Sequence, residues 1–218
     1  MRELVLFTVS GLTTAGIYAI SASGLTLTYT TTGVFNFAHG AIGMIAAFAY
    51  WQLRYGWNVP TIAAFAIVVL IAAPVVGLGV ERAIMRRLHG ASEATKLVVT
   101  VAVMLGLVSF ALWVWNPGTA RSVRPLWSGK VVEVGIVRVS YNDLLVLGVA
   151  AAVAIVLRLL LYSTRAGVAM RATVDDRDLA LLTGAQPNRS TRLAWVVGTM
   201  LAALAGICLL YTSDAADE

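Results

Sequence analysis

The sequence predicts an all-α protein, a polytopic bundle of about six transmembrane helices, each needing roughly 20 apolar residues to cross the bilayer core. Of its 218 residues, 59% are hydrophobic and only 12% are charged, whereas soluble domains carry roughly 25% charged residues. The apolar residues form long stretches, and most of the basic residues lie between those stretches. This is the pattern of a multi-pass membrane protein whose loops follow the positive-inside rule.

The apolar stretches predict spans at 4–30, 39–53, 60–80, 96–115, 143–162 and 191–210. The first lacks a small-residue cleavage site, so we expect a retained span rather than a cleaved leader. The second is short, because at about 1.5 Å per residue it reaches only some 23 Å. It is expected to be a tilted, neighbour-supported helix or a re-entrant segment, and this leaves the side of the N-terminus open.

The connections predict the orientation of the helices. Segments 81–96 and 162–192 are rich in arginine and are expected to be cytoplasmic. Segment 116–143 is expected to be extracytoplasmic, and its alternating apolar residues at 131–139 predict a short strand pair. We expect one membrane domain over residues 1–207, in contact with lipid.

Several function classes are disfavoured by what the sequence contains. One cysteine and two histidines form no pair with metal-ligand spacing, so we expect no metal site. The basic residues are scattered between apolar segments, which argues against a nucleic-acid partner. The chain also has no phosphate-binding Gly-x-x-x-x-Gly-Lys-Ser/Thr loop, so we expect no cofactor on this chain.

Two polar residues stand in a very apolar stretch, GVFNFAHGAIGM (33–44). Asn36 and His39 lie between Gly33 and Gly40, and glycines in membrane helices are tolerated where the freed backbone lines a cavity or packs on protein. The polar pair either joins helices at a break or lines a translocation pathway. For His39 we favour the structural role, through a hydrogen bond from one ring nitrogen to a neighbouring helix, because a proton relay would require several ionisable residues.

Two stretches carry a family resemblance. GLTLTYTTTGVFNFAHGAIGMIAAFAYW (24–51) and TRAGVAMRATVDDRDLALLTGAQPNRSTRLAWVVGTMLAALAG (164–206) resemble the LivH-type permease subunits of ABC importers for branched-chain amino acids. The resemblance implies a multi-pass protein of the bacterial inner membrane that moves branched-chain or other hydrophobic amino acids. It also implies three partners: ATPase subunits that hold the ATP, a second, LivM-like permease and an extracytoplasmic substrate-binding protein.

The second stretch contains a candidate contact with the ATPase. DLALLTG (178–184) matches the Glu-Ala-Ala-x-x-x-Gly pattern of importer coupling helices at Asp178, Ala180 and Gly184, and Arg171 belongs to the family-like GVAMRA before it. Family context favours the coupling role, although a solvated amphipathic connector would show the same caps.

Other functions remain as alternatives. Permeases for urea or amide-type substrates look similar, and a secondary transporter with a broken helix would explain 33–44 but not the cytoplasmic helix. An intramembrane enzyme using His39 would need a second catalytic group. The other histidine, His89, lies in a predicted cytoplasmic loop, so we expect no enzymatic activity.

The C-terminal string CLLYTSDAADE (208–218) does not read as a membrane exit, because three acidic residues follow at once on a helix that has been cut short. It resembles a translated sequencing adapter. We expect residues 208–218 to be non-native and the native subunit to continue with further spans.

Overall fold

The computed structural model describes residues 2–88, 90–116, 118, 123, 131–134, 137–175, 179, 182 and 186–213. The N-terminal half contains α1 (Arg2–Thr32), α2 (His39–Trp51), η1 (Gln52–Gly56), α3 (Thr61–Ala66), η2 (Ile67–Ala72), α4 (Ala73–Ala83) and η3 (Met85–Leu88). The C-terminal half contains α5 (Glu93–Val114), β1 (Val131–Val134), β2 (Val137–Ser140), α6 (Tyr141–Ser163), α7 (Arg165–Asp175) and α9 (Pro187–Ser213). The all-α prediction is confirmed.

Within the described residues, 4 helices are long and apolar enough to cross a membrane: Thr61–Leu88, Glu93–Val114, Tyr141–Ser163 and Asn188–Thr212. They correspond to the last four predicted spans. The number is lower than the predicted six, and the difference lies in the first two. Helix α1 has 31 residues, but threonine, serine and glycine are frequent among them. Helix α2 has only 13 residues, which confirms that it is short.

The strand pair predicted at 131–139 is present as an antiparallel hairpin. Strands β1 and β2 pair in register with Val132 opposite Val139 and Val134 opposite Val137. The hairpin leads directly into α6, where the Ser140 side chain caps the helix by accepting from the backbone N–H of Asn142.

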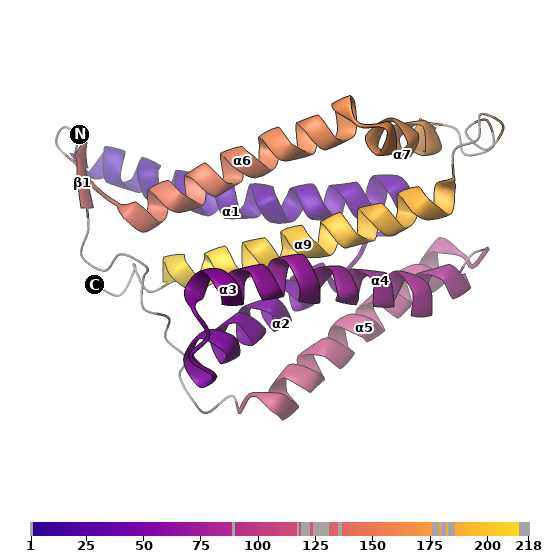
Figure 1. The fold of residues 1–218 in the computed structure, drawn as a ribbon, viewed down its shortest axis with the longest axis horizontal. Coiled ribbons are helices and arrows are strands. Elements are labelled where there is room, and N and C mark those ends of the chain that lie inside the picture. Colours follow the sequence, from indigo (N-terminus) through magenta and orange to yellow (C-terminus); the bar gives the residue numbers. More distant parts are fainter. Residues whose placement is uncertain are drawn as a thin grey trace.

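The two arginine-rich connections lie at the same end of the bundle, as predicted. Figure 1 shows α7 at one end together with the turn between α4 and α5, while β1 and the start of α1 lie at the opposite end. The positive-inside rule predicts that the α7 end is cytoplasmic. The same rule then predicts an extracytoplasmic position for the described start of α1.

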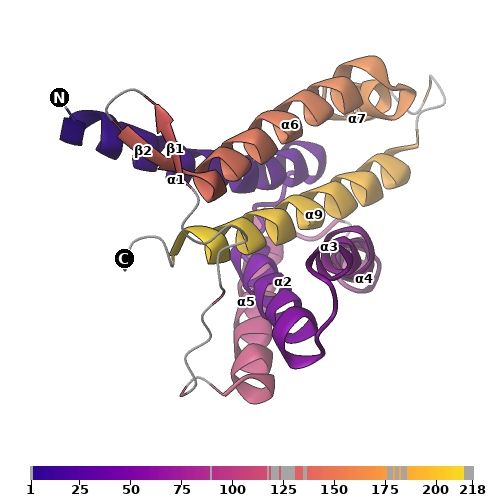
Figure 2. The same cartoon turned by 60° about the vertical axis from the view of Figure 1, so that its left-hand side comes forward.

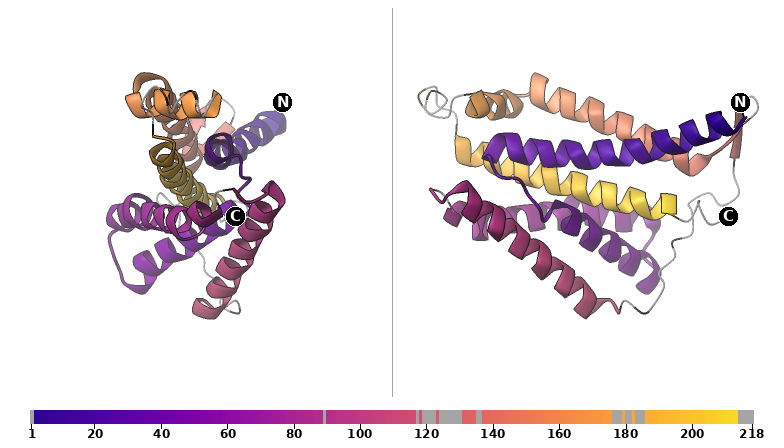
Figure 3. Two further views of the ribbon diagram at one scale, coloured as in Figure 1. Left: turned by 90° about the vertical axis from the view of Figure 1, so that its right-hand side faces the viewer. Right: turned by 180° about the vertical axis from the view of Figure 1, so that it is seen from behind.

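Helix α9 is the central helix of the bundle. It packs against α1, α2 and α4, and the view along the bundle in Figure 3 shows it between α1 and α6 on one side and α2 to α5 on the other. Figure 2 shows the same division from another direction. A helix in this position brings together residues from the first and last parts of the chain.

Glycines allow the close crossings at α9. A Cβ added at Gly24 of α1 would lie 3.0 Å from the Gly198 carbonyl, and one added at Gly43 of α2 would lie 2.8 Å from the Ala202 carbonyl. On α4, a Cβ at Gly77 would lie 2.8 Å from the Trp195 carbonyl. Close backbone approach at small residues is how membrane helices gain packing energy without a hydrophobic driving force.

The end of α9 overlaps the segment expected to be non-native. Cys208 and Tyr211 are buried, and the Tyr211 hydroxyl is hydrogen-bonded to that of Tyr50 on α2. Residues 214–218 lie outside the described residues. Packing within the chain does not test whether 208–218 is native, so that expectation stays a prediction, which sequencing of the locus would test.

Candidate functional site

The helix break comprises residues 33–38, between the end of α1 and the start of α2. Gly33 has φ +67°, a left-handed conformation that glycine adopts without the steric penalty of other residues. Its N–H donates to the Tyr29 carbonyl at 2.7 Å, which is the hydrogen bond of a glycine-terminated helix. Gly33 therefore ends α1 and turns the chain.

Side chains satisfy backbone groups that the break leaves without helical partners. The Asn36 Oδ1 accepts from the Ala38 N–H at 3.1 Å, and the Asn36 side chain is only 2% exposed. The single hydroxyl hydrogen of Thr100 on α5 is within reach of two carbonyl oxygens, that of Phe35 in the break at 3.2 Å and that of Leu97 in its own helix at 2.9 Å. Irregular backbone inside a membrane requires such compensation. The expected role of Asn36 toward the backbone is present, whereas Thr100 was not expected, because nothing in the sequence links it to residues some 65 positions earlier.

His39 begins α2 and is 5% exposed. Its ring packs over Gly24 of α1, where an added Cβ would lie 2.8 Å from the ring Cε1. The backbone carbonyl of Ser21 lies close to the ring, but neither ring nitrogen makes a hydrogen bond of acceptable geometry within the described part of the chain. His39 thus contacts the neighbouring helix α1 through Gly24 and the nearby Ser21 carbonyl, and the interhelical hydrogen bond expected from it stays a prediction.

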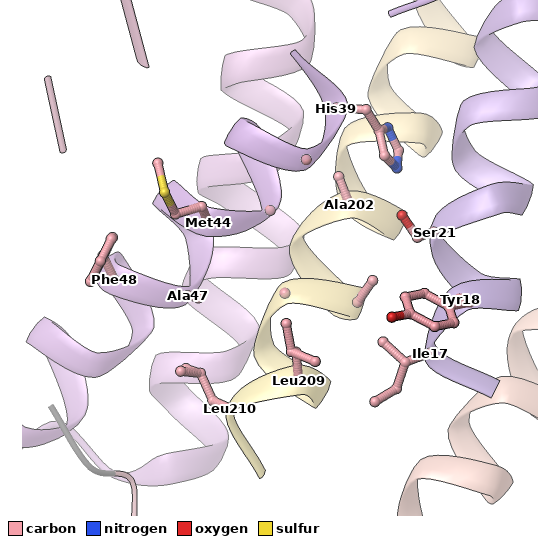
Figure 4. A pocket seen from close by; sticks show the side chains of 14 residues that line it. Ile17, Tyr18, Ser21, His39, Met44, Ala47, Phe48, Ala202, Leu209 and Leu210 are labelled. Atoms are coloured by element: carbon pink, nitrogen blue, oxygen red, sulfur yellow. The ribbon is translucent and has the colours of Figure 1, made fainter. Parts of the chain in front are cut away.

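A cavity of about 410 Å³ lies beside His39, between α1, α2 and α9. Figure 4 shows His39 at one end of the cavity, with Ser21 and Tyr18 along the α1 wall. The other lining residues are glycine or apolar: Ile17, Gly40, Gly43, Met44, Ala47, Phe48, Ala202, Ala205, Gly206, Leu209 and Leu210. Gly40 faces open space, because no atom lies within 4 Å of the position of its missing Cβ.

The structure brings the four residues expected in the first stretch together, in and around this break. Gly33 shapes the turn, Asn36 supports the backbone, and His39 and Gly40 line the cavity. We call this space the α1–α2–α9 cavity. It is a mostly apolar space, with His39 at one end and the Ser21 and Tyr18 hydroxyls spaced along its α1 wall (Figure 4).

The candidate coupling residues Asp178, Ala180 and Gly184 lie outside the described residues. Two neighbours are described, and both are apolar and exposed: Leu179 is 60% and Leu182 is 84% exposed. They are three positions apart, the spacing of residues on one helix face. Single exposed apolar side chains are common on protein surfaces, so these two leucines are open to a partner without requiring one.

Arg171 lies on α7 and is engaged within the chain. Its Nε donates to the Leu161 carbonyl in the last turn of α6 at 3.1 Å, and its guanidinium carbon lies 4.3 Å from the centre of the Tyr162 ring. A cation that binds the last carbonyls of a helix is favourably placed toward the helix dipole. These contacts join α7 to α6.

A second cluster with a buried polar residue lies at the cytoplasmic end, and no sequence pattern predicted it. Glu81 of α4 is 2% exposed, and its carboxylate lies 3.6 Å from the Arg86 Nη2 and 3.8 Å from the Arg192 Nε. We call these three residues the Glu81 cluster. It ties the end of α4 to the start of α9. Only a long-range contact map could have paired Glu81 with Arg192.

The helix break and the Glu81 cluster are neighbours. Val34 of the break is packed in one buried apolar group with Met85 of η3 and Trp195 of α9. Met85 lies within the Glu81–Arg86 segment, directly before Arg86, and Trp195 is one helical turn beyond Arg192. The break is therefore held by the same helix ends that carry the ion pairs.

The chain was compared with known proteins. The family model for the permease component of branched-chain amino acid transport systems matches residues 7–217. The permease protein BraD of Pseudomonas aeruginosa, named for high-affinity branched-chain amino acid transport, is 29% identical over 213 residues, which cover 92% of this chain and 69% of BraD. LivH of Escherichia coli K12 is 25% identical, with 92% and 68% covered.

A probable LivH of Methanocaldococcus jannaschii is 26% identical over 205 residues and is covered over 64% of its length. No solved structure matches the chain. The apolar helices described above fit the same assignment. The chain therefore belongs to the family of permease components of branched-chain amino acid transport systems, multi-pass proteins of the plasma membrane.

Proposed function

We propose that this chain is the permease subunit of an ABC importer for branched-chain or other hydrophobic amino acids, and that it catalyses no covalent reaction itself. The supporting observation is the helix break beside an apolar cavity. Broken helices at cavities are a recurrent way to expose backbone and dipole ends to a transported solute. The apolar lining favours aliphatic amino acids over urea or amides, which offer little surface to such walls.

The importer we propose has three further components: an ATPase, a second permease of the LivM type and an extracytoplasmic binding protein. The exposed Leu179 and Leu182 support an ATPase contact at the cytoplasmic end. In this proposal Asp178, Ala180 and Gly184 belong to the coupling element. Arg171 supports that element by holding α7 against α6.

The test of transport is reconstitution of these components in proteoliposomes with the permease in which the genomic continuation replaces residues 208–218, the segment expected to be non-native. ATP-driven uptake of leucine, isoleucine and valine is expected, with no uptake of urea. Uptake of urea in preference to leucine would overturn the substrate assignment. Uptake that needs an ion gradient but no ATP would overturn the importer assignment.

The coupling element is tested in the same preparation. Asp178→Arg or Gly184→Arg should leave membrane insertion intact but abolish leucine uptake and substrate-stimulated ATP hydrolysis. Gln186→Arg is the matched control, because it adds the same charge at an exposed position just beyond the element. Normal uptake by both first variants would show that residues 178–184 do not couple the subunits.

A further inference from the structure

We propose that the α1–α2–α9 cavity is a substrate-binding site, in which the cavity walls hold the aliphatic side chain and the His39 end holds the α-carboxylate. This inference rests on the proposed function and names the residues that would contact the transported amino acid. It assigns His39 to the pathway, which departs from the structural role that the sequence favoured.

The polar end is suited to a carboxylate. A neutral imidazole has one N–H donor. In His39, which is 95% buried, neither nitrogen makes a hydrogen bond of acceptable geometry among the described residues, although the Ser21 carbonyl lies close to the ring. His39 is also the first residue of α2, so the positive end of the helix dipole coincides with the ring. A buried donor without a well-formed hydrogen bond is costly, and a bound carboxylate would remove that cost.

The Ser21 hydroxyl completes the polar end. Ser21 and Tyr18 line the α1 wall of the cavity, and Figure 4 shows Ser21 nearer to His39, with Tyr18 farther along the wall beside Ile17. The Ser21 oxygen is an acceptor as well as a donor, so it suits an ammonium group next to the carboxylate. An α-amino acid presents these two groups together.

The remainder of the cavity suits an uncharged side chain. None of its lining residues is aspartate, glutamate, lysine or arginine, and Met44, Ala47 and Phe48 form an apolar wall. The volume of about 410 Å³, which includes space lined by Leu209 and Leu210 of the segment expected to be non-native, falls within the range of roughly 300–1,000 Å³ typical of small-molecule sites. A charged side chain would meet no counter-charge there, whereas leucine or isoleucine would bury its apolar surface.

The test uses photoleucine, a leucine analogue that carries a diazirine, on the complete importer in lipid nanodiscs. After irradiation, peptide mass spectrometry should find adducts on the Met44–Phe48 segment or on Ile17 and Tyr18. An excess of leucine should suppress those adducts, and an excess of lysine should not. Adducts that leucine does not suppress would show that the cavity holds lipid instead, and would overturn the site.

Two pairs of variants separate side-chain from carboxylate contacts. Ala47→Phe should fill the cavity and abolish suppressible labelling, while Ala22→Phe, at an exposed α1 position outside the cavity, should not. His39→Leu should weaken leucine competition about tenfold, the size of one hydrogen bond to a charged group. His39→Gln keeps an N–H donor and should therefore restore part of the leucine competition that His39→Leu loses.

Folding and function are monitored separately. Each variant is measured for membrane abundance and elution as a single species, so that a loss of labelling is counted only at normal abundance. Leucine uptake by the unaltered importer, with labelling confined to residues outside the cavity, would overturn this site and leave the proposed function standing. Absence of uptake of any hydrophobic amino acid would overturn both.

Discussion

The helix break and the Glu81 cluster are both buried and polar, and they lie against the same apolar group around Val34, Met85 and Trp195. They differ in how their polar groups are satisfied. In the Glu81 cluster a buried carboxylate is paired with guanidinium groups from two elements at 3.6 and 3.8 Å, which are distances of ion pairs and not of hydrogen bonds. At the break, the side chains are neutral, and His39 keeps both ring nitrogens free of hydrogen bonds within the described chain. The first arrangement stabilises one structure, and the second retains capacity to bind.

The largest effect is expected from breaking the charge balance of the Glu81 cluster. Arg86→Ala with Arg192→Ala removes both cations from a buried carboxylate, which we expect to cost about 3–5 kcal/mol. Adding Glu81→Gln to this pair should recover most of that loss. The measurement is the thermal unfolding midpoint of the detergent-solubilised permease, followed by fluorescence-detected size exclusion.

The control pair for this experiment is Arg87→Ala with Arg189→Ala. Both arginines are exposed and lie in the same two connections, so the control removes equal charge from the cytoplasmic side. If the two double variants unfold at the same temperature, the cluster has no special structural role and the contrast with the break disappears.

A smaller effect distinguishes the two glycines of the break. Gly33→Ala forces a side chain into the left-handed region, which costs roughly 1–2 kcal/mol. Gly40→Ala meets no atom within 4 Å and gains helix propensity of up to about 1 kcal/mol. The unfolding midpoint should therefore fall for Gly33→Ala and stay constant or rise for Gly40→Ala. Equal destabilisation would mean that Gly40 is a packing residue and not a cavity wall.

Thr100→Val should remove the donor that satisfies the Phe35 carbonyl. Interhelical hydrogen bonds in membranes contribute about 0.6–1.7 kcal/mol, so we expect a modest drop in the unfolding midpoint. Thr26→Val, at an exposed position on α1, is the matched control. An unchanged midpoint for both would indicate that the break does not depend on α5 for backbone support.

The smallest effect is expected at Arg171. Replacing it by alanine removes a cation–π contact and a hydrogen bond at an exposed site, together about 0.5–1 kcal/mol. Arg171→Lys should restore little, because lysine lacks the planar group that stacks on Tyr162. Normal ATPase stimulation in Arg171→Ala, with a slightly lower unfolding midpoint, would sharpen its assignment as a joint between α7 and α6.

Local patterns explain which parts of the fold were predictable from the sequence. Spans such as 143–162 and the strand pair at 131–139 depend on hydropathy and alternation within one segment, and both are confirmed. The polar residues at 33–40 were recognisable because an amide and an imidazole are costly in an apolar stretch. The glycines on either side, Gly33 and Gly40, predicted that Asn36 and His39 share one helix break. This prediction also needs only residues that are neighbours in the sequence.

Other features depend on distant contacts and escaped the sequence. The pairing of Glu81 with Arg192, and of Thr100 with the Phe35 carbonyl, joins residues on separate helices. Within the described residues four helices, fewer than the expected six, have the length and hydropathy of a membrane span, and α2 with 13 residues is too short for a full crossing. The surroundings of the His39 ring could not be inferred from the sequence, because Gly24, over which the ring packs, lies in another helix.

The central position of α9 has a consequence for biogenesis. Gly43 of α2 meets Gly206 of α9, so that contact must wait for roughly 160 further residues, or about 8–32 s at a synthesis rate of about 5–20 residues per second. During that interval the grooves of α1, α2 and α4 that α9 later occupies stay open to lipid or to the insertion machinery. Assembly of the bundle is thus a late event, triggered by the arrival of one helix rather than accumulated span by span.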